Sequence, residues 1–188
     1  MHSPPKALFD PQDAFGEMQK LKAEGKIRAV GFSFWEKIAE SYDQVAPSIE
    51  SGVVDVVQVI LSLLRPEAIR ELFPLIRKAG TGVVAREVLA NGFLTQSFTA
   101  QSKFDEEHNK SRMSQELIQS RLDQAEKYRF LVDAHPGVRT LAEAALVWAL
   151  SYPEISCVIP GAKTVAELEQ CLARLVATDH RRIASLHH

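Results

Sequence analysis

Apolar residues along the chain fall into short continuous runs and longer segments with helical spacing. Four runs, rich in β-branched residues, predict buried strands over residues 27–32, 53–60, 82–85 and 155–159. Elsewhere apolar residues recur every three or four positions, which predicts helices over residues 11–24, 36–45, 67–79, 113–134, 141–150 and 165–174. Strands that alternate with helices are typical of βαβ units and a parallel sheet.

Capping and breaking residues set the expected ends of several elements. Gly80 is a natural stop for the third helix, and Pro47 is expected to break the second. Thr140 and Thr164 each stand where a side-chain oxygen can cap the helix that follows. Residues 88–110 have mixed composition and are expected to form a long loop.

The predicted fold class is α/β, a partial (β/α)8 barrel of about four parallel strands with flanking helices. No Gly-x-Gly-x-x-Gly or Walker A motif follows any strand, so the doubly wound nucleotide-binding folds lack their fingerprint. A complete barrel needs eight strands and typically about 250 residues, whereas this chain has 188. We expect one domain over residues 1–188, with residues 183–188 as a flexible tail or the remnant of a tag.

Composition excludes several classes of function. The chain is 46% hydrophobic and carries 22 basic and 24 acidic residues, so its net charge of -2 offers no footprint for nucleic acid. No apolar run reaches the roughly 18 residues that a membrane span requires. The two cysteines, Cys157 and Cys171, are too few for a disulfide framework or a metal site, and residues 105–110 are expected to form a solvated loop. These features predict a cytoplasmic protein.

Five segments together resemble the aldo-keto reductases. They are, in chain order, residues 25–33 (GKIRAVGFS), 55–59 (DVVQV), 82–95 (GVVAREVLANGFLT), 140–150 (TLAEAALVWAL) and 157–163 (CVIPGAK). Each segment alone is weak, but their order and spacing are specific, and the resemblance extends over about residues 2–175. It implies the second half of a (β/α)8 barrel, from the end of the fourth strand to the eighth.

The resemblance also implies a reaction and its catalytic residues. Aldo-keto reductases pass a hydride from NADPH to a carbonyl carbon while a tyrosine, supported by lysine, aspartate and histidine, protonates the oxygen. His2 matches the family's histidine, although it could equally be an ordinary residue near a terminus. The family's tyrosine, lysine and aspartate lie on earlier strands and have no counterpart here. Tyr42, Tyr128 and Tyr152 lie in or beside predicted helices, so none replaces the acid by motif.

Three strand ends match the nicotinamide site of the family. Ser33 and Gln58 stand at positions that hydrogen-bond the nicotinamide carboxamide. Arg86 lies where many members carry an aromatic ring, and a planar guanidinium can stack there instead. Phe34 replaces the usual asparagine, so one polar contact is lost.

Two loops match the phosphate and adenine sites. Leu89 and Asn91 fall in the loop that covers the pyrophosphate, and Gly161 follows the last strand, where backbone amides favour phosphate. Lys163 could contact the 2′-phosphate of NADP, and Gln170 stands in the family's Glu-Asn pair for adenine. Glu167 adds a negative charge nearby, so we expect NADPH binding to be weakened.

A four-stranded half-barrel would leave its edge strands without partners. We therefore expect a homodimer, or a partner chain that covers the open edges. Three functions stay open: a carbonyl reductase completed by a partner, a repurposed enzyme of lyase or cyclase type, and a non-catalytic binding or scaffold subunit.

Overall fold

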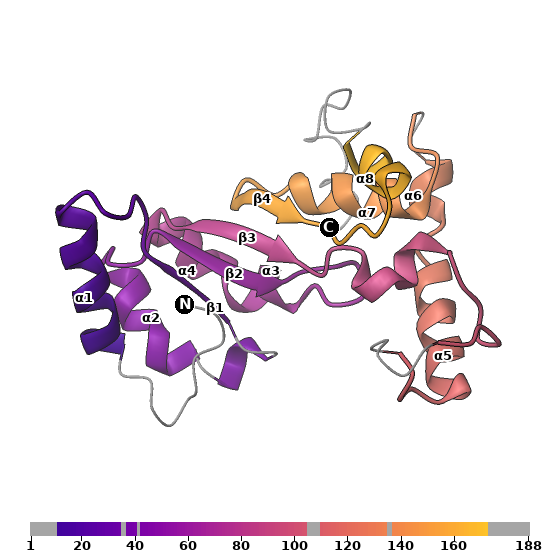
Figure 1. The fold of residues 1–188 in the computed structure, drawn as a ribbon, viewed down its shortest axis with the longest axis horizontal. Helices are drawn as coiled ribbons and strands as arrows, with labels where there is room; N and C mark the ends of the chain where they lie inside the picture. The colour runs from indigo at the N-terminus through magenta and orange to yellow at the C-terminus, as the bar shows by residue number, and fades with distance from the viewer. Residues whose placement is uncertain (1–10, 35–36, 41, 105–109, 135–136, 173–188) are drawn as a thin grey trace.

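The structure is a computed structural model that describes residues 11–34, 37–40, 42–104, 110–134 and 137–172. Its centre is a four-stranded parallel sheet in the order β1-β2-β3-β4 (Figure 1). The strands are β1 (Gly31–Ser33), β2 (Val56–Ile60), β3 (Gly82–Arg86) and β4 (Ile155–Ile159). Sequential strands that are neighbours and parallel confirm the predicted βαβ organisation.

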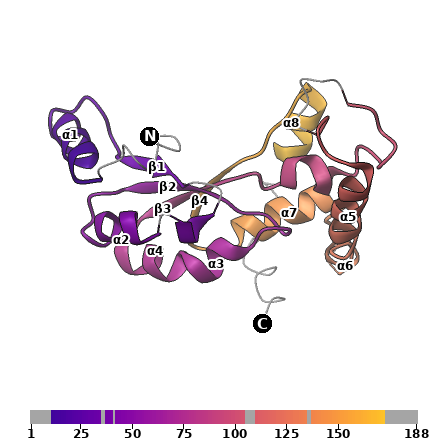
Figure 2. The same cartoon turned by 90° about the horizontal axis from the view of Figure 1, so that it is seen from below.

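The helices that follow the strands cover one face of the sheet. Figure 2 shows α2 (Tyr42–Glu50), α3 (Glu67–Glu71), α4 (Phe73–Ala79) and α7 (Leu141–Leu150) along the same side of the strands. Val57, Val59, Val83 and Ala85 alternate along β2 and β3 and are fully buried against this layer. The core therefore lies between the sheet and these helices.

The other face of the sheet carries Ser33 and Gln58, two of the predicted site residues. The register pairs Ser33 with Gln58, Gln58 with Val84, and Val84 with Cys157. Because paired residues of neighbouring strands point to the same side, these side chains share one face. In a closed barrel this face would be the interior.

Several predicted helices and strands have different bounds in the structure, and the strand expected over residues 53–60 is β2, which begins only at Val56. The second helix was expected to break at Pro47, but α2 runs from Tyr42 to Glu50 with Pro47 inside it. Pro47 is exposed while Val45 and Ile49 on the same helix are fully buried, so packing outweighs the missing N–H. The strand expected over residues 27–32 is β1, which covers Gly31–Ser33 only.

Two of the longer predicted helices are each divided into two. The helix expected over 113–134 is two helices, α5 (Gln115–Glu126) and α6 (Phe130–Asp133). The helix expected over 67–79 divides at Leu72 into α3 and α4. Gly80 ends α4 with a φ of 71°, as predicted. The expected loop over 88–110 contains a 3-10 helix, η2 (Ala90–Thr95), and the last described helix is α8 (Val165–Leu172).

The burial of β4 differs from the prediction. The apolar run over residues 155–159 predicts a buried strand, yet Ser156, Cys157 and Ile159 are exposed. In the described part of the chain β4 pairs with β3 alone, so it is an edge strand with one uncovered face. Apolar content alone does not distinguish an edge strand from a central one.

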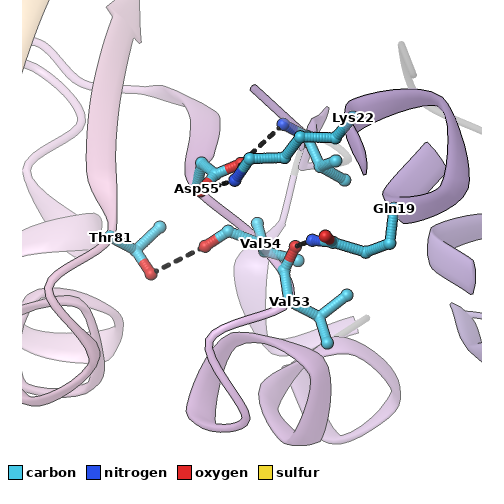
Figure 3. A network of polar contacts seen from close by, with 7 residues as sticks. Gln19, Lys22, Val53, Val54, Asp55 and Thr81 are labelled. Carbon is cyan, nitrogen blue, oxygen red and sulfur yellow. Dashed lines mark hydrogen bonds and ion pairs between the residues drawn. The ribbon is translucent and has the colours of Figure 1, made fainter. Parts of the chain in front are cut away.

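A polar network holds the segment that leads into β2. Gln19 of α1 (Pro11–Ala23) donates to the Val53 carbonyl at 2.6 Å, and Lys22 contacts both carboxylate oxygens of Asp55 at 2.7 Å (Figure 3). Asp55 also accepts the Val30 amide at 2.8 Å, and Thr81 donates to the Val54 carbonyl at 3.1 Å. Three segments distant in sequence thereby fix the start of β2 and, through it, the position of Gln58.

Candidate functional site

The sheet brings Ser33 and Gln58, both predicted nicotinamide-binding residues, next to each other. Ser33 ends β1 and is buried, and its Oγ donates to Gln58 Oε1 at 3.3 Å. The Phe34 amide donates to the Gln58 carbonyl at 2.8 Å, which extends the pairing past the end of β1. The Phe34 ring is buried beside Phe32 and offers no polar contact. The result is a hydroxyl at the carboxyl end of β1 adjacent to an amide in the middle of β2. The carboxyl ends of parallel strands are where α/β folds place their ligands.

Arg86 ends β3, on the same face of the sheet. Its guanidinium forms an ion pair with Glu87 through Nη1. Its Nε is buried and has no hydrogen-bond partner within the described structure. A buried donor that lacks an acceptor is unfavourable, so this guanidinium can still satisfy one more hydrogen bond.

The loop after β3 has an unusual backbone conformation. Glu87, Ala90 and Asn91 all have left-handed φ values, of 57°, 50° and 54°. Non-glycine residues seldom adopt this region, and such strain is found most often at binding and catalytic sites. Leu89 is buried beneath the loop, while the Asn91 side-chain amide donates to Glu87 at 3.1 Å. Asn91 is thus linked to Arg86 through the Glu87 carboxylate.

Lys110 lies beside this loop and was not predicted as a site residue. It was placed in a solvated loop, but it is buried, and its Nζ donates to the Asn91 carbonyl. The ammonium also lies 4.7–5.8 Å from the ring centres of Phe93, Phe98 and Phe104. Burial lowers the Lys110 pKa below its usual value, and the positive charge of Lys163 lowers it further. No local spacing signals this cage, because the three rings meet only when the loop folds.

The segment after β4 holds the remaining predicted cofactor-binding residues, and the backbone amide of Lys163, just before the last helix, already has a hydrogen-bond partner. The Lys163 amide donates to Glu167 Oε2 at 2.5 Å, and the Glu167 amide donates to Thr164 Oγ1 at 3.2 Å. This reciprocal arrangement confirms Thr164 as a cap. The Glu167 carboxylate therefore accepts a hydrogen bond from a backbone amide that would otherwise be available to a phosphate.

Two other predicted residues of this segment are accessible. Gly161 is exposed and has open space around it, and Gln170 is exposed on α8. Cys171, beside Gln170, is buried, as expected for a small core residue.

His2, the candidate catalytic residue, lies outside the described residues, as does the tail at 183–188. Of the three tyrosines, Tyr42 begins α2, Tyr128 follows α5 and Tyr152 precedes β4. Tyr152 packs against Phe73 and Trp148, and burial raises its pKa.

The described residues contain no group of three or more His, Cys, Asp or Glu residues placed to hold a metal ion. None of the helices among them is long and apolar enough to cross a membrane.

Parallel strands with outer helices, and polar residues gathered at the strands' carboxyl ends, define this chain as part of a (β/α)8 barrel. The model of the aldo/keto reductase family matches residues 1–187, and the chain belongs to this family.

Curated relatives and solved structures agree with this assignment. The chain is 26% identical to "Probable aldo-keto reductase 1" of Glycine max and to "NADH-specific methylglyoxal reductase" of Escherichia coli K12, covering 87% and 84% of this chain. The holo aldo-keto reductase AKR11C1 of Bacillus halodurans superposes with a TM-score of 0.67 at 21% identity over 98% of the chain. An aldo-keto reductase of Klebsiella pneumoniae in complex with NADPH gives a TM-score of 0.61 at 18% identity over 98%.

The chain spans only part of each of these proteins. It covers 46% and 47% of the two curated relatives, and 58% and 55% of the two solved structures. The predicted partial barrel is thus confirmed by both the sheet and the share of each relative that is matched.

Proposed function

We propose that this chain is the cofactor-binding half of an aldo-keto reductase and binds NADPH weakly at the carboxyl ends of β1–β4. The hydrogen bond between Ser33 and Gln58 carries the proposal, because it sets a hydroxyl and an amide side by side on the inner face of the sheet. Together they offer the donors and the acceptor that a nicotinamide carboxamide needs.

The described residues fit one end of this cofactor better than the other. Ser33 and Gln58 would hold the carboxamide, and Arg86, with its unsatisfied Nε, would lie against the nicotinamide. Leu89, Asn91, Gly161, Lys163 and Gln170 would contact the remainder, but Glu167 competes at the start of α8. When bound, the cofactor supplies the hydride. These residues bind and orient it.

No tyrosine of this chain matches the family's proton donor by motif, so we propose that carbonyl reduction depends on a donor from the complementary strands of a barrel. His2 could support that donor. Without such strands, the chain would act as a binding subunit.

Titration with NADPH, followed by nicotinamide fluorescence, tests the proposal. We expect saturable binding by the wild-type chain and about tenfold weaker binding by Gln58→Leu, which removes the carboxamide's partner. Ser48→Ala, on α2 and outside the site, is the control and should bind as the wild type. Absence of binding up to millimolar NADPH would leave the scaffold or repurposed functions instead.

We further propose that a second copy of the chain covers β4 and α8. Ile159 is 46% exposed, and Val165, Leu168 and Leu172 on α8 are 73%, 47% and 51% exposed. An edge strand beside an exposed apolar helix is a typical association surface. Two copies would provide eight strands in total, although a separate chain carrying the other half could cover the same surface.

A further inference from the structure

Lys110 joins two parts of the chain that lie far apart in sequence. Its Nζ, on the segment that leads into α5, donates to the backbone carbonyl of Asn91, in the loop after β3. Only 5% of the Lys110 surface is exposed. A buried ammonium is unfavourable unless polar or aromatic groups compensate for the lost water. An apolar side chain would fill the same space without that penalty, so what the ammonium adds is its contacts with the loop.

Three aromatic rings enclose the ammonium. The Lys110 Nζ lies 5.2, 4.7 and 5.8 Å from the ring centres of Phe93, Phe98 and Phe104. The rings also meet edge to face, with centres 5.3 Å apart for Phe93 and Phe98 and 5.5 Å apart for Phe98 and Phe104. The ring electrons attract a cation, and more strongly away from water. The rings come from η2 and from the chain that follows it, so one ammonium holds several parts of this loop together.

The carbonyl that Lys110 contacts belongs to a strained part of the backbone. Glu87, Ala90 and Asn91 have φ values of 57°, 50° and 54°, in the left-handed region that non-glycine residues rarely adopt. Within the loop, the Ala90 amide donates to the Glu87 carbonyl at 2.7 Å. Strained conformations persist only where the surrounding contacts hold them. Lys110 supplies one such contact from outside the loop.

A series of polar contacts runs from Lys110 to the end of β3. Beyond the carbonyl that Lys110 holds, the Asn91 side-chain amide donates to Glu87 Oε2 at 3.1 Å. The other carboxylate oxygen of Glu87 forms the ion pair with Arg86 Nη1. Each contact orients the next side chain, so a displacement of Asn91 would change the direction of the Arg86 guanidinium. Lys110 can therefore set the orientation of Arg86 through two intermediate residues.

We propose that Lys110 is a positioning residue for the cofactor: by holding Asn91, its ammonium fixes the loop after β3 and orients Arg86 against the nicotinamide. The inference rests on the proposed function, because Arg86 and Asn91 are expected to contact NADPH. It adds a residue that lies outside every segment in which the chain resembles the reductases. This role predicts that loss of the ammonium loosens the loop before any cofactor binds.

Hydrogen exchange of the chain without cofactor tests this first step. We expect Lys110→Met, which keeps an unbranched apolar stem and removes the ammonium, to raise the exchange rates of the Ala90, Gly92 and Leu94 amides about tenfold. All three amides donate to carbonyls of the same loop. Amides of β2 should change less than about threefold. Unchanged exchange in the loop would overturn the proposal. An equal increase in β2 would also overturn it, because Lys110 would then stabilise only the fold.

Two further variants complete this test. Lys103→Met removes the same charge from an exposed position of the same segment and should leave the loop amides exchanging as in the wild type. Phe98→Leu removes one ring around the ammonium and should raise loop exchange about threefold. If Lys110→Met does not fold, Phe98→Leu decides the question, and unchanged loop exchange in that variant would overturn the proposal.

Two ligands separate a positioning role from a structural one. By nicotinamide fluorescence, Lys110→Met should bind NADPH about tenfold more weakly than the wild type, and Lys103→Met should bind it equally well. By calorimetry, the affinity of Lys110→Met for adenosine 2′,5′-bisphosphate, which lacks the nicotinamide, should change less than about twofold. The residues proposed for that end of the cofactor, Gly161 and Lys163, follow β4.

The outcomes of these titrations are distinct. Equal weakening of both ligands in Lys110→Met, or of neither, would overturn the proposal. Weaker NADPH binding with unchanged loop exchange would overturn it too, because the ammonium would then contact the cofactor directly. If the wild type does not bind NADPH, the proposed function fails and the cofactor role fails with it, while the exchange rates still show whether Lys110 fixes the loop.

Discussion

Asp55 shows how single polar side chains position the site from a distance. Its carboxylate accepts two contacts from Lys22 and one from the Val30 amide, and so joins α1, the segment before β1 and the start of β2. The hydrogen bond from Lys22 holds the Asp55 pKa below its ordinary value of 3.8. The ionised form therefore stabilises the folded state.

We expect Asp55→Asn to lower the free energy of unfolding at neutral pH by about 1–2 kcal/mol. The contribution is complete above the unfolded pKa and disappears as pH falls through the lowered folded pKa. The stabilities of wild type and variant should therefore converge in acid, once the carboxyl is protonated in both the folded and the unfolded state. Urea unfolding at neutral and acidic pH measures this. A gap that persists in acid would contradict the assignment. Asp133→Asn, exposed on α6, serves as control.

Glu167 lies at the other end of the candidate site, where its carboxylate accepts a hydrogen bond from the Lys163 amide. Replacing it with glutamine removes a negative charge from the position proposed for phosphate. We expect Glu167→Gln to bind NADPH about three- to tenfold more tightly in the fluorescence titration. Glu169→Gln, two residues further along α8, should leave the affinity near that of the wild type. An unchanged affinity in Glu167→Gln would mean that the phosphate does not approach this helix.

Among the elements, β1 is the shortest strand and depends on one glycine. A Cβ on Gly31 would lie 2.3 Å from the Val56 carbonyl oxygen and 2.6 Å from its Cγ1. No real side chain tolerates such contacts, so any larger residue must push β1 away from β2. Ser33, two residues further along β1, would then move away from Gln58.

We expect Gly31→Ala to cost about 2 kcal/mol of stability and to weaken NADPH binding together with it. Gly16→Ala is the matched control. It lies in the middle of α1 with nothing within 4 Å of the added Cβ, so it should stabilise the helix by up to about 1 kcal/mol. Thermal unfolding distinguishes the two. A Gly31→Ala protein as stable as the wild type would show that β1 can shift freely.

The sequence predicted most elements because their signals are local. Continuous apolar runs located the four strands, and Thr140 was correctly identified as a cap, accepting the Glu143 amide at 3.1 Å. The failures involve contacts between distant residues. Pro47 is tolerated because α2 is anchored elsewhere, and the burial of Lys110 depends on three phenylalanines without helical or strand spacing. Ser33 and Gln58 lie side by side because Ser33, at the end of β1, is in register with Gln58 on the neighbouring parallel strand.

For the whole molecule, the uncovered side of β4 and α8 decides the expected oligomeric state. Light scattering on micromolar protein should give twice the 20.9 kDa mass of the chain. Leu168→Glu should shift the protein toward monomer, because it places a charge in the proposed interface. Leu117→Glu, at a similarly exposed leucine on α5, should not. A wild-type monomer would contradict the dimer and favour a separate covering chain.

The exposed edge of β4 has a further consequence, for the behaviour of the protein in solution. Residues 155–159, Ile-Ser-Cys-Val-Ile, contain no charge and no proline, and their outer backbone groups offer a template for another strand. Short uncharged segments of this kind are the usual starting points of fibrillar aggregation. A chain that covers β4 would therefore also prevent the half-barrel from aggregating through this edge.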